Sequence, residues 1–73
     1  MTQAESIISR FGGPRDLARA IGAAPSTVYK WTYPLGVNEG TGGMIPSRQH
    51  RAIHAAARRE GILLTANDWY PDN

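Results

Sequence analysis

The side chains best suited to chemistry in this chain of 73 residues lie in one short run between positions 26 and 30. Two hydroxyls, a phenol and an amine there could form hydrogen bonds with base edges or phosphates. They belong to Ser26, Thr27, Tyr29 and Lys30. If Val28 and Trp31 are the inward anchors of a helix that begins at Pro25, these four side chains must lie on its outer face. No Arg, Asn or Gln is there, so bidentate readout of bases would be sparse.

A second helix must hold this one in place, and residues 14–33 have the pattern of a DNA-binding helix-turn-helix. Two short helices that cross steeply need a small residue at the crossing, a residue that tolerates a left-handed turn, and apolar anchors. The residues expected to form this motif core are Leu17, Ala18, Ile21, Gly22, Val28 and Trp31. The first helix would then be the framework and the second the reading helix.

The rest of the chain predicts three more helices. Apolar residues spaced as in an amphipathic helix predict one over 3–11, ended by glycine. Ser47 is expected to cap a helix over 48–60 that Gly61 ends. Its inner face would hold His50, Ile53, Ala56 and Ala57. The Thr65 and Asp68 pair predicts a capped last helix over 65–70, whereas 62–64 could be a strand or a buried linker. The expected fold is a single all-α domain of about five short helices.

A glycine-rich loop is expected over residues 33–46, between the third and fourth helices. It could be a wing that reaches DNA or an insertion tolerated at the surface, and the sequence leaves both open. It is not a phosphate-binding loop of the P-loop kind, because no Lys-Ser/Thr pair follows the glycines. Met44 and Ile45 are expected to rejoin the core.

Charge is concentrated in the middle of the chain. Residues 10–59 hold all eight basic residues and only Asp16 and Glu39 as acids, so eight minus two leaves +6 there. A basic centre indicates a polyanionic partner. Arg15, in the first turn of the helix that Pro14 opens, is the leading phosphate contact, with a plain Gly-Gly-Pro helix break as the alternative. Arg48 and Arg51 are further phosphate candidates, with solvated helix charges as the alternative.

Several classes of protein are excluded or disfavoured. Without cysteine there is no disulfide or thiolate metal site, which suits a reducing cytoplasm, and no apolar run is long enough to span a membrane. His50 and His54 have the spacing of a zinc pair but lack the accompanying Glu, so we expect structural histidines and no metal. No catalytic constellation is present, so we expect neither an enzyme nor a cofactor.

Two large aromatic residues near the end of the chain have two interpretations. Trp69 and Tyr70 could fold back to complete the core. They could instead form a patch for a partner, since interfaces are enriched in both residue types.

The segments FGGPRDLARAIG, APSTVYKW, TGGMIPSRQH and GILLTANDWY together resemble Cro-type (XRE-like) phage-repressor proteins. The resemblance is to the short carph-isopro and YdaS-like members, and it spans nearly the whole chain. It implies a lambda-repressor-like fold that binds duplex DNA as a homodimer at an inverted repeat. Base contacts would fall on Ser26, Thr27, Tyr29 and Lys30, and phosphate contacts on Arg15 and Arg48. The chain departs from the pattern at Pro25 and in its long loop.

Two functions follow as hypotheses. The first is a transcriptional repressor, based on the helix-turn-helix pattern and the basic centre; the resemblance implies that it acts in a phage-like or domesticated phage element. The second is an antitoxin or interaction module that neutralises a partner protein through Trp69 and Tyr70.

Overall fold

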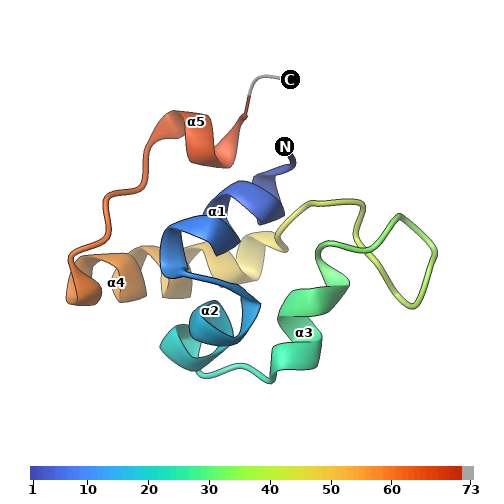
Figure 1. The fold of residues 1–73 in the computed structure, drawn as a ribbon, viewed down its shortest axis with the longest axis horizontal. Helices are drawn as coiled ribbons and strands as arrows, with labels where there is room; N and C mark the ends of the chain where they lie inside the picture. Colours follow the sequence, from blue (N-terminus) through green and yellow to red (C-terminus); the bar gives the residue numbers. More distant parts are fainter. Residues whose placement is uncertain (72–73) are drawn as a thin grey trace.

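The computed structural model describes residues 1–71, in which five α-helices and one short 3₁₀ helix surround one apolar core (Figure 1). The helices are α1 (Gln3–Phe11), α2 (Pro14–Ile21), α3 (Pro25–Lys30), η1 (Ser47–Gln49), α4 (His50–Glu60) and α5 (Ala66–Trp69). Residues 1–71 contain no β-strand, so the predicted all-α class is confirmed. No helix in this described part combines the length and apolar character needed to cross a membrane.

Proline and glycine mark the helix ends, as predicted. Pro14 and Pro25 occupy the first helical positions of α2 and α3, where a missing N–H costs no hydrogen bond. Gly12, Gly22 and Gly61 follow α1, α2 and α4 with φ values of 97°, 73° and 70°. Glycine adopts this left-handed conformation without strain, and each of the three N–H groups bonds back to its helix.

Two helices begin with a capping box. At α5 the Thr65 side chain accepts from the Asp68 backbone N–H and the Asp68 side chain accepts from the Thr65 backbone N–H, as the sequence predicts. At α1 the same arrangement joins Thr2 and Glu5, with Glu5 N donating to Thr2 Oγ1 over 3.1 Å and Thr2 N donating to Glu5 Oε1 over 2.9 Å. This second box has the same T-x-x-E/D signature in the sequence but was not predicted.

The fourth helix starts later than predicted. Ser47–Gln49 form the 3₁₀ helix η1, and α4 begins at His50. The Ser47 side chain makes no capping hydrogen bond, and Gln49 N donates to Pro46 O over 2.9 Å. Because that bond spans three residues rather than four, it closes a 3₁₀ turn. The prediction of a Ser47 cap on a helix over 48–60 was therefore wrong at its N-terminal end.

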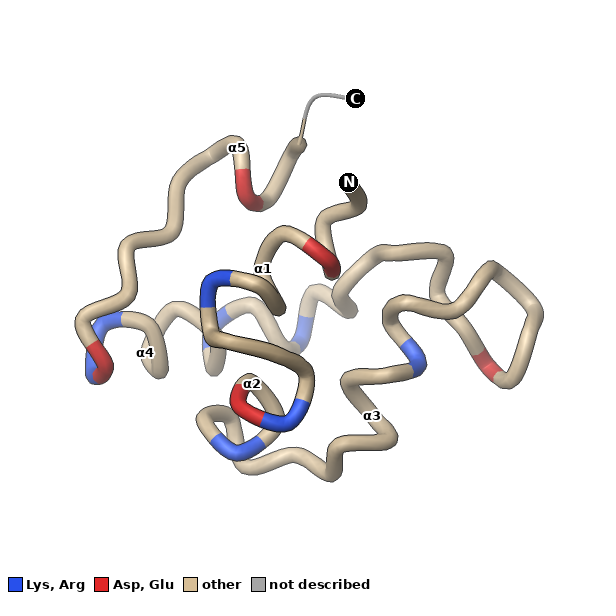
Figure 2. The backbone as a smooth tube through the Cα atoms, in the orientation of Figure 1, with Lys and Arg blue, Asp and Glu red and all other residues tan. Residues whose placement is uncertain are grey.

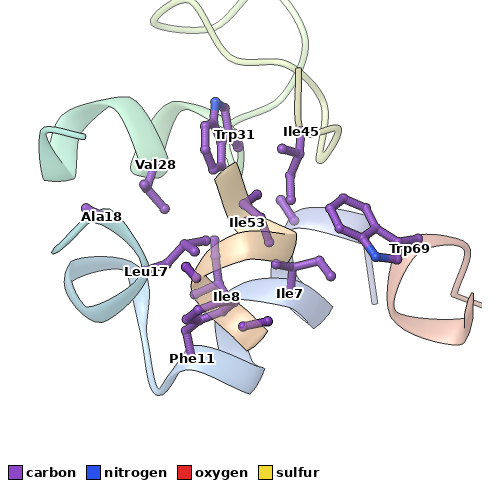
Figure 3. Close-up of a cluster of buried hydrophobic side chains, with 13 residues drawn as sticks. Ile7, Ile8, Phe11, Leu17, Ala18, Val28, Trp31, Ile45, Ile53 and Trp69 are labelled. Atoms are coloured by element: carbon purple, nitrogen blue, oxygen red, sulfur yellow. The ribbon is translucent and has the colours of Figure 1, made fainter. Parts of the chain in front are cut away.

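The core draws on all five helices and the end of the loop (Figure 3). Its largest fully buried side chains are Ile7, Leu17, Val28 and Ile53. Two expectations need correction. Ile21 is half-buried at the edge of the cluster, and Met44 is 57% exposed while Ile45 is buried. Ile45 N donates to the Gln3 side-chain oxygen over 2.8 Å, which holds Ile45 rather than Met44 against α1.

The segment that joins α4 to α5 is an irregular linker rather than a strand. Ile62 and Leu64 are half-buried against the core, and Leu63 between them is 78% exposed. This alternation lets one short segment cover the core with every second residue while it crosses to α5.

A buried carboxylate attaches α5 to α1. Asp68 Oδ1 accepts hydrogen bonds from Ser6 Oγ over 2.9 Å and from Arg10 Nε over 3.0 Å, and Asp68 Oδ2 accepts from Thr65 N over 2.9 Å. Burial raises the pKa of Asp68, but the Thr65 backbone N–H, Arg10 and Ser6 outweigh it and lower the pKa to about 2. The carboxylate is thus ionised at neutral pH and fully bonded.

The aromatic pair at the end of α5 divides between core and surface. Trp69 is 9% exposed, and its ring centroid lies 4.4 Å from that of His50 and 4.9 Å from that of His54. Tyr70 is 78% exposed. The core interpretation therefore holds for Trp69 and not for Tyr70. His50 is only half-buried, because its ring covers one side of Trp69 instead of entering the core with Ile53.

Candidate nucleic-acid interface

A three-residue turn sets the position of α3 against α2. Gly22 ends α2 in the left-handed conformation, and Ala23 N donates to Ala18 O over 2.9 Å. Pro25 then starts α3, which packs directly against α2. Ala18 is almost fully buried, as expected for the small residue at a close crossing. The turn and the crossing together fix which face of α3 points outward.

The outer face of α3 carries the four side chains singled out in the sequence. Figure 3 shows Val28 and Trp31 pointing into the core, where they are 0% and 2% exposed. On the other side Ser26 is exposed and Tyr29 is 38% exposed, while Thr27 and Lys30 are half-buried. The surface therefore offers two hydroxyls, one phenol and one amine on a helix of only six residues.

Tyr29 lies where α3 meets the turn between α1 and α2. Together with Thr32 it lines an open hollow of about 460 Å³ whose opposite wall includes Ile8, Gly13 and Pro14. The phenol is thereby placed beside the start of α2. One of the predicted base contacts thus adjoins the predicted phosphate site.

The start of α2 carries charges of both signs. Gly13 precedes the helix without a side-chain cap, and Arg15 is exposed with no ion pair to any of residues 1–71. Asp16 in the same turn pairs with Arg19, with 3.0 Å between Asp16 Oδ1 and Arg19 Nη2. Free N–H groups and Arg15 favour an anion here, whereas the Asp16 carboxylate limits the side from which it can approach.

The remaining cations lie on other elements. Arg48 is in η1 and Arg51 is in the first turn of α4; both are exposed and form no ion pair with residues 1–71. Figure 2 shows that Lys and Arg are spread over α1, α2, α3 and α4 rather than gathered on α3. The positive charge is therefore distributed around the molecule, and α3 contributes one amine to it.

That amine has a partner that sequence reasoning missed. Lys30 Nζ lies 2.7 Å from Glu39 Oε1, an acid on the glycine-rich loop. The hydrogen bond from Lys30 and its positive charge lower the pKa of Glu39, so the carboxylate is ionised at neutral pH. Glu39 is the single acid between positions 17 and 59, which is the signal that could have drawn attention to it.

The two histidines lie against Trp69. His50 Nε2 lies 3.0 Å from Ile45 O, and both rings face Trp69. Within residues 1–71, no three His, Cys, Asp or Glu side chains gather where they could hold a metal ion.

A second hollow, of about 500 Å³, lies on the side of the molecule formed by α5 and the N-terminal residues. Met1, Met44 and Tyr70 line it, and all three are well exposed, whereas Trp69, which also lines it, is 9% exposed. This apolar surface contains no side chain of α3.

Comparisons with known proteins give no indication of the function of this chain. No protein family, curated protein or solved structure matches this chain. The function must therefore be inferred from the surfaces described above.

Proposed function

We propose that this protein is a sequence-specific regulator of transcription that binds duplex DNA through a lambda-repressor-like helix-turn-helix. The observation that carries the proposal is the register of α3 against α2. Leu17, Val28 and Trp31 are buried, so the opposite face of α3 projects hydroxyl, phenol and amine groups into solvent. Those groups match the donors and acceptors of base edges in the major groove. A Cro-like repressor of a phage-like element is the form we favour.

The length of α3 favours a homodimer. Six residues at a rise of about 1.5 Å each make a helix roughly 9 Å long, which covers about three base pairs at 3.4 Å per step. So short a contact discriminates weakly among sites in a genome. Two copies on an inverted repeat, with half-sites about 34 Å apart, would double the sequence that is read.

Phosphate contacts would supply much of the affinity. Arg15, Arg48 and Arg51 are exposed and unpaired within residues 1–71, so each is available to a phosphate without first breaking an ion pair. Because α3 carries a single cation, we expect specificity to depend also on DNA shape and on the dimer. Binding should weaken steeply as the salt concentration rises.

The experiment begins with selection of a binding site from random duplexes, followed by titration of the selected site by fluorescence anisotropy. Tyr29→Ala combined with Lys30→Ala should weaken specific binding by about 30-fold or more, since each base contact contributes roughly 1–3 kcal/mol. The matched control is Tyr70→Ala with Arg58→Ala, which removes one exposed aromatic and one exposed cation elsewhere.

The outcomes separate the parts of the proposal. Unchanged affinity in the α3 double variant, with circular dichroism like that of the wild type, would refute this reading surface. Failure of the wild type to select or bind any duplex would refute DNA binding itself.

A second candidate function, neutralisation of a partner protein, is favoured by the apolar hollow around Met1, Met44 and Tyr70. Deleting residues 65–73 would not test it, because Asp68 and Trp69 support the fold. Tyr70→Ala changes an exposed side chain only. Loss of a partner's binding in that variant, with DNA binding intact, would favour this function over the first.

A further inference from the structure

We propose that Glu39 limits the affinity for DNA by competing with DNA for Lys30; this rests on the proposed function. In the free protein the Glu39 carboxylate lies 2.7 Å from the Lys30 amine, the single charged group of α3. A nucleic-acid phosphate and the carboxylate are both anions that use the same N–H donors. Lys30 can therefore donate a hydrogen bond to DNA only after it separates from Glu39.

The loop backbone holds Glu39 at this place. Thr41 N donates to Lys30 O over 3.1 Å, so the loop returns to the end of α3 two residues after Glu39. Gly40 N donates to Val37 O over 2.8 Å, and Gly40 is packed so closely that an added Cβ would lie 2.4 Å from Pro34 O. The loop is thus a bonded turn, and its tip cannot swing away freely from Lys30.

The backbone at Glu39 is itself unfavourable for that residue type. Asn38 and Glu39 have φ values of 50° and 64°. Asparagine tolerates the left-handed region, but glutamate is strained there, and glycine would adopt this conformation at a lower cost. A non-glycine residue in a strained conformation points to a role for its side chain. Contact with Lys30 is the one hydrogen-bonding role that this side chain has within residues 1–71.

The pair is suited to reversible competition rather than to a permanent lock. The Lys30 side chain is 42% exposed and that of Glu39 is 77% exposed, so water and salt weaken their attraction. Another acceptor, such as a phosphate or a guanine edge, can take the amine if it is well placed. A poorly placed phosphate forms only a weak contact with Lys30 and is repelled by the Glu39 carboxylate.

The consequence is a cost to every DNA complex that uses Lys30. Non-specific affinity is almost entirely electrostatic, so a masked cation and an adjacent anion reduce it directly. In the specific complex Lys30 has left Glu39, so the full cost of separating the pair lowers the affinity for the selected site. Glu39 would therefore lower both affinities, the specific one at least as much as the non-specific one.

The test is Glu39→Gln, with Glu60→Gln as the control that makes the same charge change at the exposed end of α4. Anisotropy titrations use a random-sequence duplex and the selected site between about 50 and 200 mM salt. For the random duplex we expect Glu39→Gln to bind about 2- to 5-fold more tightly than the wild type. The slope of log K against log salt should steepen by about 0.9, the contribution of one added phosphate contact. On the selected site, where Lys30 contacts DNA in both proteins, the affinity should rise at least as much and the slope should not change.

Three results would overturn the inference while leaving DNA binding intact. One is equal binding of random DNA by the wild type and Glu39→Gln. A second is an equal gain in Glu60→Gln, which would reduce the effect to net charge. A third is an undiminished gain from Glu39→Gln when Lys30→Gln is also present. Absence of duplex binding by the wild type and all variants is a different outcome, because it refutes the proposed function and the inference with it.

Discussion

Replacing Asp68 with Asn should destabilise the fold without touching the proposed DNA surface. The Asp68 side chain is 4% exposed, and its two oxygens accept four hydrogen bonds, from Ser6, Arg10 and two groups of Thr65. Asparagine keeps the shape but replaces one oxygen with an NH₂ group, which would face donors instead of accepting from them. The change therefore removes a charge and breaks at least one side of the cluster that joins α5 to α1.

The magnitude follows from the pKa of Asp68. That pKa falls from 3.8 to about 2 on folding, and each unit corresponds to about 1.36 kcal/mol, so the ionised carboxylate adds roughly 2 kcal/mol at neutral pH. Because the folded-state pKa is the lower one, this contribution is complete above about pH 5 and is lost as the pH falls towards 2. Arg10 is 52% exposed and regains water in the variant, so we expect less than the 3–5 kcal/mol typical of fully buried pairs.

Urea unfolding followed by circular dichroism would measure the effect. At pH 7 we expect Asp68→Asn to lower the free energy of unfolding by about 2–3 kcal/mol, which is some 8–20 °C in Tm for a domain of this size. The difference from the wild type should shrink by about 2 kcal/mol between pH 5 and pH 2.

Asp16→Asn is the matched control, because it removes an exposed carboxylate from a surface pair and should change stability by under about 0.5 kcal/mol. Equal stability of Asp68→Asn and the wild type at pH 7 would refute the assigned role of the cluster. A large difference that did not depend on pH would refute its electrostatic basis.

Two further substitutions test the packing, each by urea unfolding. Gly43→Ala should lower the free energy of unfolding by about 2 kcal/mol or more, because Gly43 has φ +92° and a Cβ there would lie 2.5 Å from Thr2 Cβ. The control is Gly61→Ala, at φ +70° with open space around it, which should cost only about 1 kcal/mol. Equal losses of stability in the two variants would argue against the clash at Gly43. Trp69→Phe should stay within about 1 kcal/mol of the wild type, because the indole N–H is buried and no residue among 1–71 accepts its hydrogen bond, so its removal offsets part of the lost packing. A loss near 3 kcal/mol would mean that this N–H does have a partner.

Local signals predicted the helix ends where one residue type has few alternatives. Pro14 and Pro25 cannot lie inside a helix, and Gly12 and Gly61 are free to turn left-handed, so those ends could be placed from the sequence. The prediction of a Ser47 cap was wrong because a serine before a helix does not indicate whether the first turn is α or 3₁₀. Here the hydrogen bond from Gln49 N to Pro46 O makes that turn 3₁₀.

Contacts between distant residues could not be predicted in the same way. The Thr65 and Asp68 capping box was visible as a local pattern in the sequence. Arg10 also bonds to the Asp68 carboxylate, but the two residues are 58 positions apart, and no rule of residue spacing predicts a contact at that separation. The Lys30 and Glu39 pair was missed for a related reason. A loop rich in glycine has many possible paths, and only the Thr41 to Lys30 backbone bond selects this one.

The two bonds of Gln3 have a consequence for the order in which the chain folds. Its side chain donates to Trp69 O over 2.9 Å and accepts from Ile45 N over 2.8 Å, across separations of 66 and 42 residues. Neither bond can form until long loops have closed, at an entropic cost that neighbouring helices do not incur. α2 and α3 adjoin in the chain and can pack early, whereas α5 and the end of the loop must dock late. Native-state hydrogen exchange would then find their amides opening together, as one unit that Gln3 bonds at both ends.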